Sequence, residues 1–191
     1  MIRAESIRVM HPLFHTGQGG STPTSALQLR FGKCEPCSAV AMVRAYHSRL
    51  PRCQAGPWMY AFEAEHDGIR YAAALWNNPS ARCLPGHWIE LRRMVCVDDA
   101  PRYTASRFLA WMVRWIAKYH PEHERAISYQ DTAVHKGTIY KACGWSAAQT
   151  TTARVRDRSK NRIGTNRAYR SNINGVQCDA GAKVRWEKTV R

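Results

Sequence analysis

The stretch that decides the fold runs from Glu90 to Trp145 and reads ELRRMVCVDDAPRYTASRFLAWMVRWIAKYHPEHERAISYQDTAVHKGTIYKACGW. A strand-like run is followed by an amphipathic helix, a second strand-like run and a short helix. The apolar residues of segment 104–119 recur at helical spacing, which makes it the clearest helix of the chain. This order predicts one α/β crossover, and its polar residues gather where the strands end, which is where such folds build a ligand cleft.

The sequence on either side extends this crossover into one α/β domain. Asp67-Gly68 separates two apolar runs and predicts a hairpin. A helix is expected at 35–47, and further strands are expected at 27–32, 58–64, 69–76, 87–97 and 145–152. We therefore divide the chain into an N-terminal arm (1–26), a central α/β domain (27–152) and a basic C-terminal extension (153–191).

The charge of the chain points to a polyanionic partner. There are 29 Lys and Arg residues against 14 Asp and Glu, which gives a net charge of +15. Seven basic side chains crowd the extension and are expected to contact phosphates of a nucleic acid, with a solvated tail as the alternative. They are Arg154, Arg156, Arg158, Lys160, Arg162, Arg167 and Arg170.

The apolar runs are too short for a membrane helix, and the first residues lack a secretory core, so we expect a cytoplasmic protein. Its seven cysteines are then expected to be reduced. Cys34 and Cys37 form a lone CxxC. That motif has two interpretations, a metal or redox site and two incidental thiols near a helix start.

Several polar residues of the crossover are candidates for a reaction centre. Arg93 is expected to share a sheet face with Leu91 and Val95, where its charge needs an anion, either a ligand or an internal carboxylate such as Glu90 or Asp131. Asp131 ends a strand where α/β folds place ligands. Tyr140, on the short helix after it, adds a phenol, and the pair suits proton transfer or metal ligation.

The junction before the long helix is a candidate phosphate cradle. A helix N-terminus offers free N–H groups and the positive end of the helix dipole. Arg102, Thr104, Ala105 and Ser106 lie there, with Thr104 as the expected N-cap. The alternative is an ordinary capped helix start. His47 follows the first helix and is a candidate metal ligand or catalytic group, although a lone His is more often structural.

Three pieces of the block, ELRRMVCVDDAPRYTASRFLAW, SYQD and HKGTIYKACGW, together resemble the Mom family of phage DNA-modification proteins. The resemblance implies a GNAT-like fold, with a mixed, mostly antiparallel central sheet flanked by helices. It implies transfer of a carbamoylmethyl group to N6 of adenine in double-stranded DNA, which protects phage DNA from host restriction. It also implies a small-molecule donor, acetyl-CoA or another, and iron.

The resemblance also implies roles for individual residues. Arg93, Asp131 and Tyr140 match the family's active site, and His47 matches a metal or catalytic position. Two residues depart from the family's usual pattern: Tyr103 stands in place of Asn, and Gln130 in place of Ala.

Two other functions remain as alternatives. One is a GNAT acetyltransferase for a small amine or a protein, and the other is a catalytically inactive DNA-binding protein. The oligomeric state is left open, with a homodimer among the alternatives.

Overall fold

The computed structural model describes residues 21–47, 53–152, 172–173, 176–177 and 181–190 of the 191. The main sheet has seven strands in the order β1-β2-β3-β4-β5-β9-β6, and β7 and β8 form a separate pair. The elements are β1 (Arg30–Lys33), α1 (Pro36–Tyr46), β2 (Tyr60–His66), β3 (Ile69–Asn77), β4 (Trp88–Cys96), α2 (Thr104–Tyr119), β5 (Arg125–Asp131), α3 (Thr138–Ala142), β6 (Ser146–Thr151), β7 (Asn172–Ile173), β8 (Val176–Gln177) and β9 (Lys183–Thr189).

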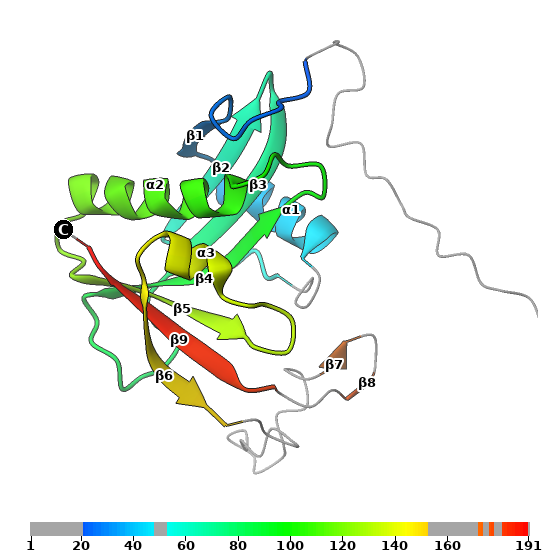
Figure 1. The fold of residues 1–191 in the computed structure, drawn as a ribbon. Helices are drawn as coiled ribbons and strands as arrows, with labels where there is room; N and C mark the ends of the chain where they lie inside the picture. Colours follow the sequence, from blue (N-terminus) through cyan, green and yellow to red (C-terminus); the bar gives the residue numbers. More distant parts are fainter. Residues whose placement is uncertain (1–20, 48–52, 153–171, 174–175, 178–180, 191) are drawn as a thin grey trace, which may run out of the picture.

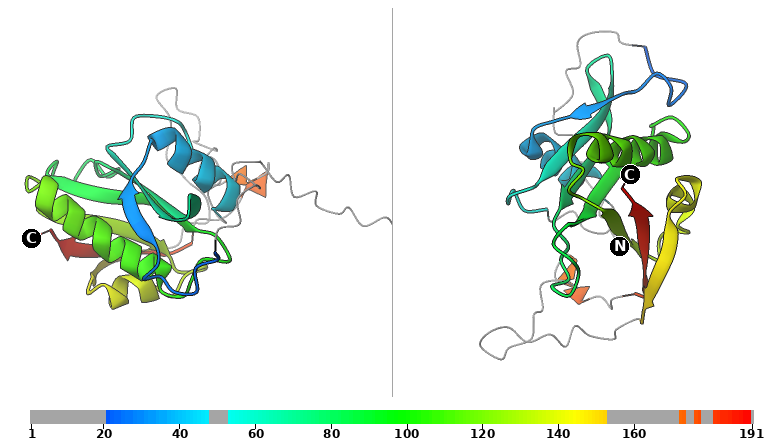
Figure 2. Two further views of the ribbon diagram at one scale, coloured as in Figure 1. Left: turned by 90° about the horizontal axis from the view of Figure 1, so that it is seen from above. Right: turned by 90° about the vertical axis from the view of Figure 1, so that its left-hand side faces the viewer.

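The two long helices cover opposite faces of the sheet, as the two views in Figure 2 show. On one face α2 packs over a core that includes Trp76, Phe108 and Met112. On the other face α1 covers a smaller core around Val43 and Leu75. Only β4 and β5 pair in parallel within the seven-stranded sheet, and every other pair is antiparallel. The predicted fold class, a mixed and mostly antiparallel sheet flanked by helices, is confirmed.

The helix α2 has the bounds that the sequence pattern predicts, 104–119. Its apolar side chains form one face: Phe108, Leu109, Met112 and Ile116 are fully buried. Burial of each such side chain stabilises the fold by about 1.5–3 kcal/mol. The prediction that Thr104 is the N-cap is wrong. Tyr103 is the N-cap residue, with φ +71°, and Thr104 is the first residue inside the helix.

The hairpin predicted from Asp67-Gly68 is confirmed. These two residues join β2 to β3 and have φ values of +48° and +77°. Positive φ at both positions is the type I′ geometry that matches the twist of the flanking strands. Other predicted boundaries move by a few residues; strand β1, for example, begins at Arg30 instead of at residue 27.

One part of the predicted C-terminal extension, residues 183–189, belongs to the domain itself. Strand β9 lies between β5 and β6, so residues 183–189 are part of the central sheet (Figure 1). The charged residues of this strand hid the alternation of Val184 and Trp186, which produces a half-buried strand. At the other end of the chain, Ala26 is 3% exposed and packs in the main core, so the last residue of the predicted arm belongs to the domain.

The described residues contain no helix both long and apolar enough to span a membrane. The seven basic residues predicted to contact DNA, Arg154 to Arg170, lie outside the described part of the chain.

Candidate functional site

The candidate site is an opening between β4 and β5. The two strands pair in parallel only from Trp88 with Arg125 to Leu91 with Ser128. Beyond that point β4 continues to Cys96 and β5 to Asp131, and Figure 1 shows their arrowheads pointing apart. Past Leu91 and Ser128 the facing edges therefore do not pair with each other, so this is where an extended ligand could pair with them. This opening lies at the carboxyl ends of two parallel strands, where the sequence predicts a cleft.

A β-bulge in β4 sets the direction of Arg93. Leu75 lies opposite Arg93 while the next residue, Trp76, lies opposite Leu91, so Arg92 is the extra residue. The bulge turns Leu91 toward the core under α2 and leaves Arg93 on the α1 face, where Leu75 and Val95 lie. The prediction that Arg93 and Leu91 share a face is therefore wrong.

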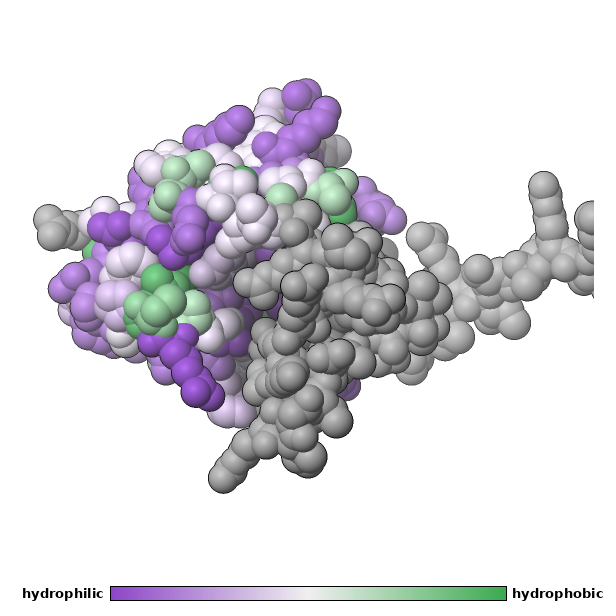
Figure 3. Space-filling model, turned by 90° about the horizontal axis from the view of Figure 1, so that it is seen from below, coloured by the Kyte–Doolittle hydropathy of each residue, from purple (hydrophilic) through white to green (hydrophobic). Residues whose placement is uncertain are grey.

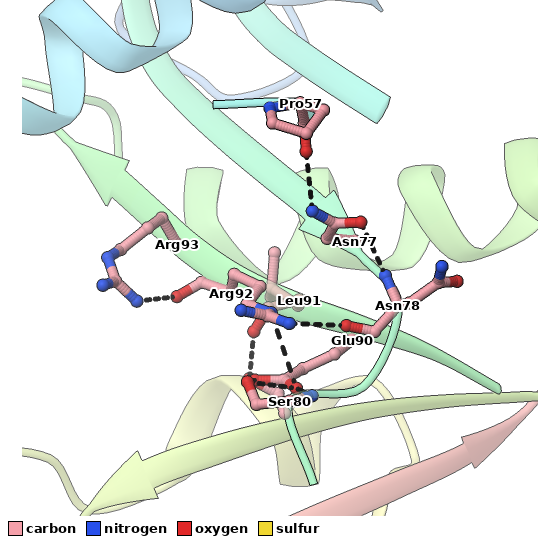
Figure 4. Close-up of polar contacts among 9 residues, drawn as sticks. Pro57, Asn77, Asn78, Ser80, Glu90, Leu91, Arg92 and Arg93 are labelled. Carbon is pink, nitrogen blue, oxygen red and sulfur yellow. Dashed lines mark hydrogen bonds and ion pairs between the residues drawn. The ribbon is translucent and has the colours of Figure 1, made fainter. Parts of the chain in front are cut away.

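Arg93 has no carboxylate partner among the described residues. One terminal nitrogen of its guanidinium donates to the Arg92 carbonyl at 2.7 Å, and its Nε is buried without an acceptor. Burial lowers the pKa of this guanidinium below its ordinary value. Glu90, a predicted partner, instead accepts from the backbone N–H and hydroxyl of Ser80 and pairs with Arg92 at 3.6 Å. Figure 4 shows Arg93 pointing away from this group.

The imidazole of His47 lies near both Arg93 and His135. His47 follows α1, and its pKa is lowered to about 4, first by burial and then by the charges of Arg93 and His135. His47 is therefore neutral at neutral pH. A metal cation beside a guanidinium is disfavoured, and the described residues hold no group of three or more His, Cys, Asp or Glu that suits a metal. The structure does not support the predicted iron site at His47, and we derive no step through a metal.

The pKa of His47 predicts a pH-dependent stability. Between its ordinary value of 6.5 and about 4, the unfolded chain binds a proton that the folded chain does not. The free energy of unfolding should therefore fall as the pH drops through this window. His47→Gln should lose less stability than the parent over the same range. Urea unfolding at several pH values measures this, and parallel pH curves for the two proteins would contradict it.

Tyr140 lies at the point where β4 and β5 separate. Ser128 donates to the Leu91 carbonyl at 3.3 Å, so its oxygen is placed to accept from the Tyr140 hydroxyl at 2.9 Å. Burial raises the pKa of Tyr140, and the Ser128 hydrogen bond opposes that rise. The Tyr140 ring stacks on Trp186 of β9 with centroids 5.4 Å apart. The phenol is thus held rigidly and protonated at neutral pH.

Sequence reasoning missed three residues that support Tyr140: Ser128, Gln130 and Trp186. The Trp186 indole N–H donates to the Gln130 side-chain oxygen at 2.6 Å, and the Gln130 amide donates to the His135 carbonyl. Gln130 therefore fixes both the stacking ring and the turn after β5. The departure from the family pattern at Gln130 is a sequence signal for this role. The alternation of Val184 and Trp186 is a signal for strand β9.

Asp131 is the last residue of β5, on the opposite side of the strand from Gln130, and therefore on the same sheet face as Arg93. Its carboxylate accepts from the Ala133 N–H at 3.0 Å. The structure therefore brings Arg93 and Asp131 to one face of the opening. Tyr140 lies on the opposite face of the sheet. Its hydroxyl is hydrogen-bonded to Ser128, which lies at the point where β4 and β5 stop pairing.

The start of α2 offers backbone donors rather than hydroxyls. The Thr104 hydroxyl is buried and donates to the Pro101 carbonyl at 2.7 Å, and the Ser106 hydroxyl donates to Tyr103. The first α-helical bond is donated by Arg107 to Tyr103, so the amides of Ala105 and Ser106 precede the helical ladder.

Arg102, the remaining member of the predicted cradle, is exposed and stacks over the Tyr103 ring at 4.9 Å. Of the four cradle residues, therefore, Ala105 and Ser106 contribute amides, Arg102 contributes charge, and the Thr104 side chain is already engaged.

The CxxC residues lie away from this site, at the start of α1. Burial raises the pKa of Cys34 to about 12, with a further contribution from Glu63, and Cys37 is exposed. A thiol that stays protonated at neutral pH is a poor nucleophile. This geometry favours the interpretation as two incidental thiols.

Comparison with known proteins identifies both a family and a fold. A sequence model of the Mom protein family matches residues 28–188. No curated protein matches the chain. Among solved structures, a GNAT-family acetyltransferase from Streptococcus pneumoniae is similar with 12% identity and a TM-score of 0.56, over 85% of this chain and 99% of that one.

Two further structures agree. A ribosomal-protein-S5-alanine acetyltransferase from Vibrio fischeri has 10% identity and a TM-score of 0.56, over 85% of this chain and 93% of that one. An acetyltransferase from Bacillus subtilis, solved in complex with CoA, has 11% identity and a TM-score of 0.51, over 85% and 99%. At these identities the similarity shows a common fold.

Proposed function

The chain belongs to the Mom protein family, and we propose that it is a GNAT-fold transferase that places a carbamoylmethyl group on N6 of adenine in DNA. The observation that carries this proposal is Arg93. Its guanidinium is partly desolvated, has no carboxylate partner among the described residues, and lies at the opening between β4 and β5. Such a group is kept for a ligand with an anionic or carbonyl oxygen.

The opening and the start of α2 fit a CoA-type donor. The amides of Ala105 and Ser106 precede the first α-helical bond and suit a pyrophosphate, and Arg102 adds charge beside them. The unpaired edges of β4 and β5 suit the amides of an extended arm. The donor must carry a leaving group on the methylene carbon of the carbamoylmethyl group, so that the N6–CH2 bond forms as that bond breaks. Acetyl-CoA matches the CoA-type arm but lacks both this leaving group and the amide nitrogen, so acetyl-CoA alone does not supply the complete group.

Each site residue then has a chemical task. Adenine N6 is paired inside the duplex, so the base must leave the stack before reaction. Its amino lone pair is delocalised into the ring, so N6 needs help from a base. Asp131 accepts a hydrogen bond or a proton from N6, and Arg93 holds an oxygen of the donor. Tyr140, protonated and held by Ser128, gives a proton to the leaving group.

The position of the segment between β6 and β9 supports a DNA-binding role beside this centre. The basic residues Arg154 to Arg170 belong to the sequence between β6 and β9, and the ends of that sequence are anchored together because Thr151 lies opposite Lys183. Lys183 in turn lies opposite Asp131. The described ends of this segment therefore lie beside Asp131, and we propose that its basic residues contact DNA phosphates. The described surface seen from below is largely hydrophilic, with hydrophobic side chains in small patches (Figure 3).

One experiment tests the proposal against its alternatives. The chain is expressed in bacteria, and the digested host DNA is examined by mass spectrometry for adenosine with an added carbamoylmethyl mass. We expect this product from the parent and at least about 100-fold less from Asp131→Asn at equal expression. Unmodified DNA from well-expressed parent protein would count against the proposal. Acetylation of a small amine or a protein without DNA would favour an acetyltransferase, and DNA binding without a mass change would favour an inactive binding protein.

A further inference from the structure

A second pocket, of about 220 Å³, lies between α2, the end of α3 and the last residues of β9. It lies at the paired end of β5, since Lys188 is opposite Ala126, whereas the opening begins beyond Ser128. It is therefore separate from the proposed reaction centre. Its lining residues are Ala110, Val113, Arg114, Cys143, Trp145, Lys188 and Thr189.

The charged and strongly polar groups of this pocket are hydrogen-bond donors. Arg114 is exposed on α2 and makes no ion pair among the described residues. Lys188 donates one of its ammonium protons to the Gly144 carbonyl at 3.0 Å, which leaves two for a ligand. Trp145 is 5% exposed, and its buried indole N–H has no acceptor. A buried donor without a partner costs free energy, and an acceptor that reached this shielded N–H would stabilise the site.

The donors and charges select the class of ligand. Two cations suit an oxyanion and match the charge of a phosphate group. Among the described residues no carboxylate lines this pocket. The nearest one along β9, Glu187, lines the neighbouring cavity and is engaged by Arg125 at 2.5 Å and Arg185 at 2.9 Å. Ala110 and Val113 form an apolar part of the wall, which suits an organic body attached to the phosphate.

We propose that the pocket formed by Arg114, Trp145 and Lys188 binds a phosphate group, carried either on a small organic molecule or in a DNA backbone. The proposal does not rest on the transferase function, because the pocket shares no residue with the opening between β4 and β5. A neighbouring cavity of about 410 Å³ also uses Lys188 and Thr189, so the occupant has room to extend along β9 toward Ser146.

The indole N–H resonances in heteronuclear NMR spectra give a site-specific test. Trp145→Phe identifies the Trp145 signal by its loss. Inorganic phosphate and ribose phosphate, titrated into the full chain, should shift this signal and leave most other indole signals in place. Arg114→Gln and Lys188→Gln should each weaken the response roughly tenfold. Lys118→Gln is the matched control, because Lys118 is exposed one turn further along α2 and stacks on Tyr119 outside the pocket.

A short DNA duplex separates the two sources of phosphate. If DNA is the occupant, Arg114→Gln and Lys188→Gln lower duplex affinity, and each lowers the salt slope of binding by about 1. If a small organic phosphate is the occupant, duplex affinity is unchanged while the ribose phosphate response still depends on both cations. The proposal is overturned if phosphate leaves the Trp145 signal unmoved, or if the two variants respond as Lys118→Gln does.

Discussion

The Arg93→Gln protein is expected to fold at least as stably as the parent and to modify DNA about 100- to 1000-fold more slowly. The prediction follows from two properties of Arg93: its guanidinium is partly desolvated, and it makes no ion pair among the described residues.

A desolvated charge without a counter-ion opposes folding. Its removal should therefore not lower the free energy of unfolding. Burial already lowers the pKa of Arg93, and the neighbouring charge of Arg92 lowers it further. A neutral amide of smaller size keeps a donor for the Arg92 carbonyl and removes the unpaired charge. Activity should fall because the developing charge on the donor would lose its nearest cation in a partly dry opening.

Arg92→Gln is the matched control for this prediction. Arg92 is the bulge residue beside Arg93, but it bonds to the Asn78 carbonyl at 2.7 Å and pairs with Glu90, so its role is to hold the loop before β4 (Figure 4). Its loss should lower stability by about 1 kcal/mol and leave modification largely intact. Urea unfolding and mass spectrometry of host DNA measure the two effects. Equal losses of activity in both variants, or a destabilised Arg93→Gln, would contradict the assigned roles.

Local sequence patterns were sufficient for much of the fold. The bounds of α2 follow from the spacing of Phe108, Met112 and Ile116, and the hairpin follows from Asp67-Gly68. Both are short-range signals, in which neighbouring residues alone determine the conformation. Two of the three catalytic candidates, Asp131 and Tyr140, also follow from their places at the end of a strand and on the next helix.

Other features depend on contacts between distant segments and have no local signal. The direction of Arg93 depends on a bulge, and the bulge appears only in the pairing of β4 with β3. The Ser128 link to Tyr140 depends on the tertiary position of α3. The basic composition before β9 made 183–189 look like part of a tail, because net charge reports on the partner of a segment and not on its fold.

Gly137→Ala is expected to destabilise the protein by about 2–5 kcal/mol and to disturb the support of Tyr140. Gly137 has φ +71°, and the left-handed conformation costs a residue with a side chain about 1–2 kcal/mol. A Cβ at this position would lie 2.5 Å from the Gln130 Oε1 and 2.7 Å from Cζ2 of Trp186. Relief of that overlap in a packed region costs about 1–3 kcal/mol more.

The overlap matters for function because Gln130 and Trp186 are bonded to each other and Trp186 stacks on Tyr140. Gly144→Ala separates the two causes. Gly144 has a similar φ of +66°, but a Cβ there would meet only the flexible end of Lys188, at 3.2 Å. Gly144→Ala should therefore lower the free energy of unfolding only by the cost of the left-handed backbone conformation, about 1–2 kcal/mol. The near-ultraviolet circular dichroism of the stacked rings should stay unchanged. Urea unfolding measures both losses of unfolding free energy. Equal losses would mean that the positive φ alone, and not close packing against Trp186, requires glycine at position 137.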